Sequence, residues 1–184
     1  MPPRIAPVGP PYSESLLKWM PPGAPAEPLK LFRTLAVNQE LADRMRPLGA
    51  GLLGHGRLGL RERELVIDRA CARAGAEYEW GVHATAFGAA AGLTADELAA
   101  TAARGPEAFP DAADADLIAL VDELHDTATV SAALWERLAA RYDEPTLLEA
   151  LILAGWYRLI AGVINAVAIE LEPWAARFPA RMGA

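Results

Sequence analysis

Four acid–base side chains are concentrated in one segment of the chain, residues 61–93. Glu64 and Asp68 are four residues apart, and Glu79 and His83 repeat that spacing. On a helix, residues four apart lie on one face about one turn from each other. A carboxylate beside an imidazole raises the pKa of the imidazole and fixes the orientation of its ring. The Glu79/His83 pair therefore predicts a general acid or base that titrates near neutral pH.

To bring these side chains together, the segment must form two helices that fold back on each other. The pair Gly75-Ala76 marks the turn between them. In an antiparallel hairpin centred there, Asp68 stands level with His83, whereas Glu64 lies about 6 Å away along the helix axis. Glu64 would then need a favourable rotamer or a bridging water to reach the imidazole. Either carboxylate could serve as the partner of His83, and periodicity does not choose between them.

The same residues also fit two other interpretations. A Glu/His pair four residues apart is often a solvated surface pair worth a few tenths of a kcal/mol, but Tyr78, Trp80 and Phe87 give this pair an apolar setting. Desolvation there would displace the pKa of each group. The two glutamates and His83 could instead supply three metal ligands, but the sequence has no second Glu-x-x-His set and its other histidines are far away. We therefore expect no metal.

Composition limits the classes of function. The chain has 184 residues, of which 53% are hydrophobic and 22% charged, and this is typical of one soluble globular domain. Its net charge is −7 and it has no run of five or more Lys or Arg residues, so binding to nucleic acid is not expected. Cys71 is the single cysteine, which excludes an intramolecular disulfide and a dithiol redox pair. We expect a cytoplasmic protein.

The sequence also argues against a membrane protein. Prolines interrupt the N-terminal residues, where a signal peptide needs a continuous apolar core. The longest apolar stretch, residues 150–168, contains Arg158 within a helical pattern. We expect this helix to be buried at the core of an oligomer. Its polar groups, Tyr157 and Asn165 among them, must find partners at a subunit interface or at a pocket wall.

The elements around the central hairpin are predicted to be helices throughout, because apolar residues recur at helical spacing without sustained alternation. The Pro-rich residues 1–28 form an extended arm, and residues 29–184 form a single compact multi-helix domain built around the antiparallel hairpin. Start signals for three helices are Asn38, the capping box of Thr94 with Glu97, and Ser131. Beside the hairpin, helices are predicted at 29–37, 39–53, 94–103, 114–125, 131–141 and 144–169.

The central segment also resembles a known family. RERELVI at 61–67 and GAEYEWGVHATAFGAAAGLT at 75–94 are similar to the signature of the carboxymuconolactone decarboxylase family, which includes the alkylhydroperoxidase D-like proteins. The resemblance is dense over residues 60–100 and looser on either side. It implies an alkylhydroperoxidase D-like all-α fold and homo-oligomers with sites near the subunit interfaces.

In the peroxidase branch of this family, a glutamate precedes a Cys-x-x-Cys pair that a histidine follows. These positions fall on Glu64, on Ala76 and Glu79, and on His83, so both cysteines are absent from this chain. Peroxide reduction by a dithiol needs a thiolate and a resolving thiol. The resemblance therefore disfavours dithiol peroxidase activity here.

A glutamate at position 79 resembles the decarboxylase branch, whose members carry out cofactor-independent decarboxylation with a double-bond shift on a lactone acid. The resemblance implies a carboxy-lyase that needs no cofactor and acts on a small organic acid or lactone. Loss of CO₂ leaves electron density that must be protonated at carbon, so the site needs a proton donor and a base. We expect His83 to be the proton shuttle, with Glu64 and Glu79 tuning its pKa or relaying its proton.

Substrate binding is assigned to an arginine and to aromatic residues near the pair, namely Arg61, Tyr78, Trp80 and Phe87. Arg63 and Arg158 are further candidates for holding acid groups. The alternative to an enzyme is a non-catalytic oligomeric protein that binds small organic acids on the same scaffold.

Overall fold

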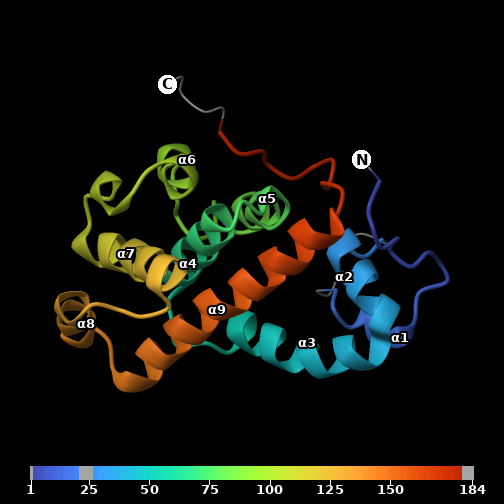
Figure 1. Cartoon of the computed structure of the whole chain (residues 1–184), viewed down its shortest axis with the longest axis horizontal. Helices are drawn as coiled ribbons and strands as arrows, with labels where there is room; N and C mark the ends of the chain where they lie inside the picture. The colour runs from blue at the N-terminus through green and yellow to red at the C-terminus, as the bar shows by residue number, and fades with distance from the viewer. Residues whose placement is uncertain (1, 21–26, 180–184) are drawn as a thin grey trace.

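The computed structural model describes residues 2–20 and 27–179, and over these residues the backbone is helical with no strand (Figure 1). This confirms the predicted all-α fold. The helices are α1 Glu14–Leu17, α2 Lys30–Leu35, α3 Gln39–Gly54, α4 Leu60–Arg73, α5 Glu77–Ala86, α6 Ala95–Ala103, α7 Ala112–Thr127, α8 Ala132–Ala139 and α9 Glu144–Val167, with 3₁₀ turns at Ala36–Asn38 and Pro106–Ala108.

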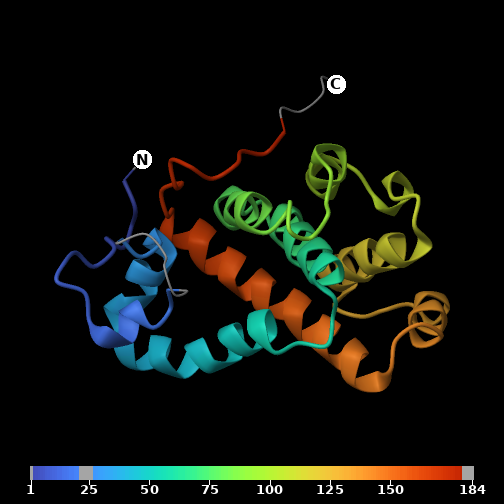
Figure 2. The same cartoon turned by 180° about the vertical axis from the view of Figure 1, so that it is seen from behind.

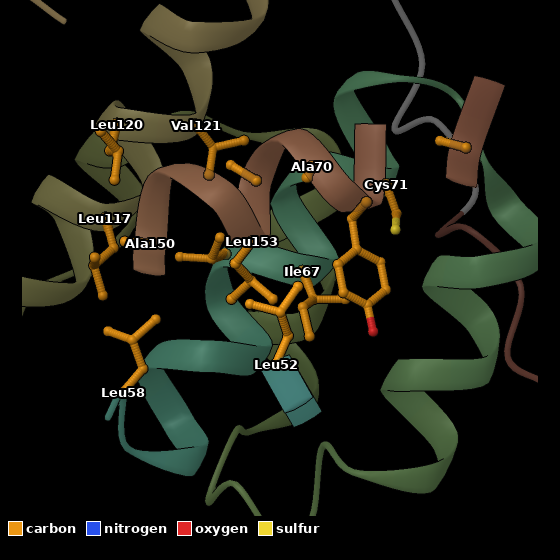
Figure 3. Close-up of a cluster of buried hydrophobic side chains, with 14 of the residues drawn as sticks. Leu52, Leu58, Ile67, Ala70, Cys71, Leu117, Leu120, Val121, Ala150 and Leu153 are labelled. Carbon is orange, nitrogen blue, oxygen red and sulfur yellow. The ribbon is translucent and has the colours of Figure 1, made fainter. Parts of the chain in front are cut away.

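Helix α4 packs against α5, α6, α7 and α9. In Figure 1, α9 runs obliquely across the middle of the molecule, with α6, α7 and α8 on one side and α1, α2 and α3 on the other. The view from behind in Figure 2 shows the same division. Figure 3 shows the core where α4, α7 and α9 meet, with Ile67 of α4 beside Leu153 of α9. Because burial of apolar surface is the main favourable term in folding, this core fixes α4 and α9 relative to each other.

Helix boundaries follow the predicted start signals. The side chains of Asn38, Thr94 and Ser131 each accept a hydrogen bond from a first-turn amide of the helix that follows. Glu97 completes the capping box by accepting from the amide of Thr94 at 2.8 Å. Several boundaries differ from the prediction by one or two residues; for example, α7 begins two residues earlier, where Asp111 supplies the cap, and α9 ends two residues earlier, at Val167.

The predicted Pro-rich arm packs on the chain's own helices where it is described. The amide of Arg4 donates to the carbonyl of Val167 at the end of α9, at 2.7 Å. The ring of Trp19 lies 4.9 Å from that of Phe32 in α2. Residues 21–26 of the arm lie outside the described residues. The described part of the arm thus covers the end of the molecule that contains α2.

After α9, the chain returns along α5 (Figure 1). The amide of Ala176 donates to Thr85 Oγ1 at 2.9 Å and to the carbonyl of Gly81 at 3.3 Å. A Cβ atom at Gly81 would lie 2.1 Å from the carbonyl oxygen of Ala176, so a larger residue cannot occupy this position without displacing the segment. The ring of Phe178 packs 5.2 Å from that of Trp80. Helix α5 is therefore enclosed between α4 and this C-terminal segment.

Helix α9 is long and apolar enough to span a bilayer by length and composition, yet one of its faces is part of the core. Leu153 and Ala161 are fully buried on that face. The opposite face exposes Leu148 and Leu159, whose side chains are 58% and 51% exposed. The burial agrees with the predicted core helix, and its place at the centre of an oligomer stays a prediction.

Candidate active site

The turn between α4 and α5 sets the position of the acid–base residues. The amide of Gly75 donates to the carbonyl of Ala72, and the amide of Ala76 donates to the carbonyl of Cys71, both at 2.9 Å. This pair of bonds is a Schellman motif, in which the first residue after the helix adopts a left-handed conformation. Gly75 has φ +67°, which a glycine tolerates without strain. The turn lies where the sequence predicts it.

His83 is the centre of the site. Its Nδ1 atom lies 2.8 Å from Glu64 Oε2, and its Nε2 atom lies 3.1 Å from the hydroxyl oxygen of Tyr157 and 3.7 Å from Glu79 Oε1. The imidazole is 4% exposed and the Glu64 carboxylate 1%. The structure thus brings together the three predicted catalytic residues, from α4 and α5, and adds a tyrosine from α9.

The hydrogen bonds indicate how the imidazole is protonated. A carboxylate can only accept, so Nδ1 carries a hydrogen that it donates to Glu64. In the neutral imidazole, Nε2 then accepts from the hydroxyl of Tyr157. Burial by itself lowers the pKa of His83, but the hydrogen bond to Glu64 and the charge of Glu64 are the largest opposing effects, and the pKa is raised above its usual value. Nε2 is therefore the nitrogen that can exchange a proton with another molecule.

Two of the groups around Nε2 favour their neutral forms. Burial raises the pKa of Glu79, although the neighbouring His83 partly offsets the effect. Burial also raises the pKa of Tyr157 well above its usual value, so its hydroxyl keeps the hydrogen. Glu64 differs from these two groups, because it forms the ion pair with Arg63 that is described next.

Arg63 holds the oxygen of Glu64 that His83 does not use. Its Nε and Nη2 atoms donate to Glu64 Oε1 at 2.8 and 2.6 Å, and its Nη1 donates to the carbonyl of Leu53. The guanidinium lies 5.5 Å from the ring centre of Phe87, and that ring is 5.2 Å from the imidazole. Both oxygens of Glu64 are therefore engaged, which fixes the carboxylate that orients His83.

The choice between Glu64 and Asp68 is settled in favour of Glu64. The argument from axial level placed Asp68 nearer to His83, because it assumed straight antiparallel helices and ignored the direction in which each side chain leaves its helix. Asp68 is fully buried instead, and neither of its oxygens has a hydrogen-bond partner among the described residues. Burial raises the pKa of Asp68 well above its usual value, and the charge of Glu64 adds to this.

The contact of Tyr157 with His83 is the part of the site that could not be predicted from the sequence. Tyr157 was one of several polar groups in an apolar helix that needed a partner, and nothing in the sequence links it to His83, 74 positions away. Asn165 in the same helix donates to the carbonyl of Ala74 at 2.7 Å. Arg158 donates to the carbonyl of His125, also at 2.7 Å. All three find partners within the chain.

Three of the predicted substrate-binding residues direct their polar atoms to other partners. Arg61 forms ion pairs with Glu97 and Asp114, which tie α4 to α6 and α7. The hydroxyl of Tyr78 donates to Glu172 at 2.7 Å, and Trp80 Nε1 donates to Thr101 at 3.0 Å. Phe87 is the one of the four that packs against the imidazole. Their binding roles stay predictions.

Cys71 lies on the same face of α4 as Glu64 and Asp68, and its side chain is fully buried. Burial raises the pKa of its thiol well above the usual value, with Glu79 adding to the effect, so the thiolate needed for nucleophilic attack is suppressed. Over the described ranges, no three His, Cys, Asp or Glu side chains are arranged to hold a metal ion. The polar side chains that surround the imidazole of His83, those of Glu64, Glu79 and Tyr157, are acid–base groups.

The described structure also shows a cleft of about 190 Å³ between α4, α7 and α9. Apolar residues line most of it, with His125 and Arg158 contributing polar groups. None of the residues that contact His83 lines this cleft. The site around His83 is consequently closed in this conformation.

Comparison with protein-family models gives a match to the central part of the chain. Residues 39–123 match the model of the carboxymuconolactone decarboxylase family, a stretch that runs from α3 into α7 and contains Glu64, Glu79 and His83. No curated protein matches the chain. The all-helical fold is consistent with the alkylhydroperoxidase D-like fold that the sequence signature implies. Residues 39–123 are thus similar to the carboxymuconolactone decarboxylase family, and Ala76 and Glu79 stand where the peroxidase signature has its cysteine pair.

Proposed function

We propose that this protein catalyses cofactor-independent acid–base chemistry, a decarboxylation or an isomerisation, on a small carboxylated or lactone substrate. The observation that carries the proposal is the orientation of His83. Its Nδ1 is held by Glu64 at 2.8 Å, so that Nε2 is left to exchange a proton. A histidine oriented by a carboxylate in this way is suited to general acid–base catalysis.

In a decarboxylation, the bond between carbon and the carboxylate breaks and its electron pair stays on the substrate. A conjugated carbonyl or lactone takes up this pair as an enolate, and CO₂ leaves. The imidazolium of His83 then gives its Nε2 proton to a carbon further along the conjugated system, which shifts the double bond. Glu64 stabilises the imidazolium before the transfer and keeps the ring in place after it. No external oxidant, reductant or electron carrier is required.

Tyr157 and Glu79 are placed to assist at Nε2. Tyr157 OH lies 3.1 Å from Nε2, and it can donate a hydrogen bond to an enolate oxygen if a substrate displaces it from the ring. Glu79 Oε1 lies 3.7 Å from Nε2 and its other oxygen has no hydrogen-bond partner among the described residues, so it can pass a proton to the imidazole. Arg63 can hold a carboxylate if it gives up its bond to the carbonyl of Leu53.

A panel of lactone acids and unsaturated carboxylic acids tests the proposal. We expect CO₂ release or isomerisation of at least one compound and, in D₂O, one deuterium at the carbon that is protonated. His83→Gln should abolish both signals, while Cys71→Ala should retain them. Turnover that survives His83→Gln unchanged would show that the proposed site is wrong.

One observation favours a second function, that of a non-catalytic protein that binds small organic acids. Side chains occupy both nitrogens of His83, and the cleft beside α4 does not reach the imidazole. The same panel separates the two functions. A binding protein would show a higher melting temperature with a ligand, without any product and without deuterium incorporation.

The chain is also proposed to form a homo-oligomer through the exposed apolar face of α9. Leu148, Ile152 and Leu159 recur on that face at helical spacing. Light scattering on the purified protein gives the subunit number directly. A monomer at micromolar concentration would contradict this assembly without bearing on the chemistry of His83.

A further inference from the structure

Unpartnered buried polar atoms are confined to one place. Among the described residues, three buried side-chain nitrogen or oxygen atoms lack a hydrogen-bond partner, and they are both carboxyl oxygens of Asp68 and Oε2 of Glu79. Asp68 is 0% exposed and lies one helical turn after Glu64. Native proteins pair nearly all such atoms, so an unpaired carboxyl group at this position needs a physical explanation.

The surroundings of Asp68 do not support a negative charge. The titratable groups that face Asp68 and His83 are Glu64 and Cys71 on α4, Glu79 on α5 and Tyr157 on α9. The guanidinium of Arg63 donates to Glu64 and to a backbone carbonyl, not to Asp68. The charged residues of α6 and α7 that meet α4, namely Glu97, Asp114 and Asp122, pair with Arg61 and Arg69.

A carboxylate with no donor and no solvent is very costly to bury, whereas a carboxylic acid is much less so. His83 is the remaining cation in the cluster, and its Nδ1 hydrogen is directed at Glu64. The charge of His83 favours the ionised form of Asp68, but burial outweighs it.

We propose that Asp68 keeps its proton at neutral pH and, as a positioning residue, limits the negative charge around His83 so that the imidazolium can release its proton to a substrate. This inference rests on the proposed acid–base function. If Asp68 were ionised, a third carboxylate would stabilise the imidazolium and make it a weaker acid. Asp68 itself donates no proton in the reaction.

The titration of His83 tests the proposal without a substrate. Asp68→Asn replaces a neutral acid by a neutral amide of the same shape, so the midpoint of the His83 titration, followed by NMR, should move by less than about 0.3 unit. Glu64→Gln removes a real carboxylate and should lower that midpoint by about one unit or more. An Asp68→Asn variant that lowers the midpoint as far as Glu64→Gln does would overturn the proposal.

Thermal unfolding provides a second measurement. In the unfolded chain Asp68 ionises near pH 4, whereas the folded chain retains the proton, so the wild type loses stability relative to Asp68→Asn as the pH rises above that value. We expect the variant to melt at a higher temperature than the wild type at pH 7, and this advantage to shrink towards pH 4. A difference in melting temperature that is the same at both pH values would contradict a neutral Asp68.

A second substitution serves as a control in case the amide group introduced by Asp68→Asn does not fit the space of the carboxyl group. Asp68→Leu is also uncharged and should show the same dependence of the melting-temperature difference on pH. With a substrate in hand, the midpoint of the pH–rate profile should be nearly the same in Asp68→Asn as in the wild type, and a midpoint lowered by about one unit or more would overturn the link to proton release. Failure to find any substrate would reject the proposed function alone, because the two measurements on the free protein stand independently of turnover.

Discussion

Helix α4 contributes to two buried clusters of charged residues, and the polar atoms of the two clusters are hydrogen-bonded to different degrees. Around Arg69, every guanidinium nitrogen donates, with two bonds of 2.7 Å to Asp122 and bonds to the carbonyls of Thr101 and Arg104. Around His83, three carboxyl oxygens have no partner among the described residues. Both clusters bury charge, so burial alone does not distinguish a site from scaffold.

The difference between the two clusters shows where the chain tolerates the energetic cost of burying unpaired polar atoms. A fully paired cluster ties α4 to α7 and to the end of α6, and nothing about it calls for a ligand. An incompletely paired cluster raises the pKa values of its buried acid groups, and such displaced pKa values are typical of functional sites. The contrast can be tested by substitutions that separate stability from turnover.

The largest expected effect is on catalysis. His83→Gln should lower turnover of an accepted substrate by about 10²- to 10⁴-fold, because it removes the proton donor. Arg63 still holds Glu64 in this variant, so stability should change less than it does on substitution of Arg69. Steady-state kinetics and urea unfolding measure the two quantities. A variant that loses stability but retains turnover would reverse the roles of the two clusters.

Arg69→Met should have the opposite pattern. It leaves the carboxylate of Asp122 and two backbone carbonyls without their donor, at a cost of about 3 kcal/mol in the free energy of unfolding. The folded fraction should turn over substrate at the rate of the wild type. Arg44→Met, which breaks an exposed pair with Glu40, is the matched control and should cost less than about 0.5 kcal/mol. Equal losses in the free energy of unfolding in the two variants would show that the buried cluster stabilises the fold no more than the exposed ion pair does.

Tyr157→Phe should have a smaller effect on both quantities. It removes the hydroxyl that bonds Nε2 and leaves that buried nitrogen without its nearest partner, at a cost of about 1–3 kcal/mol. Urea unfolding measures the loss. We expect turnover to fall by less than it does in His83→Gln. A larger fall would make the phenol, and not the imidazole, the principal acid.

The smallest expected effect concerns pH. Glu79 and His83 both have raised pKa values, so each binds its proton more tightly in the folded state than in the unfolded one. Their contributions to stability are present at low pH and decline as the pH rises, for Glu79 from about pH 4.5 upward and for His83 from about pH 6.5 upward. Glu79→Gln should flatten this decline relative to the wild type in urea unfolding at a series of pH values. A steeper decline in the variant would mean that Glu79 is stabilised as an anion.

Local signals explain why much of the fold could be predicted from the sequence. Asn38, Thr94 and Ser131 cap helices through bonds to residues three positions away, and Gly75 marks a turn that needs positive φ. The Glu79/His83 pair was predictable for the same reason, since both residues lie on one helix. Such features depend on a few neighbouring residues and not on tertiary packing.

The remainder of the site depends on contacts between distant segments. The bond from Tyr157 to His83 depends on how α9 crosses the hairpin, and the preference for Glu64 over Asp68 depends on side-chain direction. Arg61 was predicted to bind substrate, but it forms ion pairs with Glu97 and Asp114. These residues lie on α6 and α7, and periodicity alone could not show that the two helices pack beside Arg61. The sequence shows that Arg61 is a cation, but it does not show which carboxylates pair with it.

The C-terminal segment that lies along α5 has a consequence for local opening. A helix of ten residues is marginal in water on its own, so α5 owes its order to what packs on either side of it. Detachment of the segment near Ala176 would uncover Gly81 and Trp80 on the helix that carries His83. Hydrogen exchange should therefore show the amides of α5 and of this segment losing protection together, as one cooperative unit. The last described residues would then control how often the buried imidazole meets solvent.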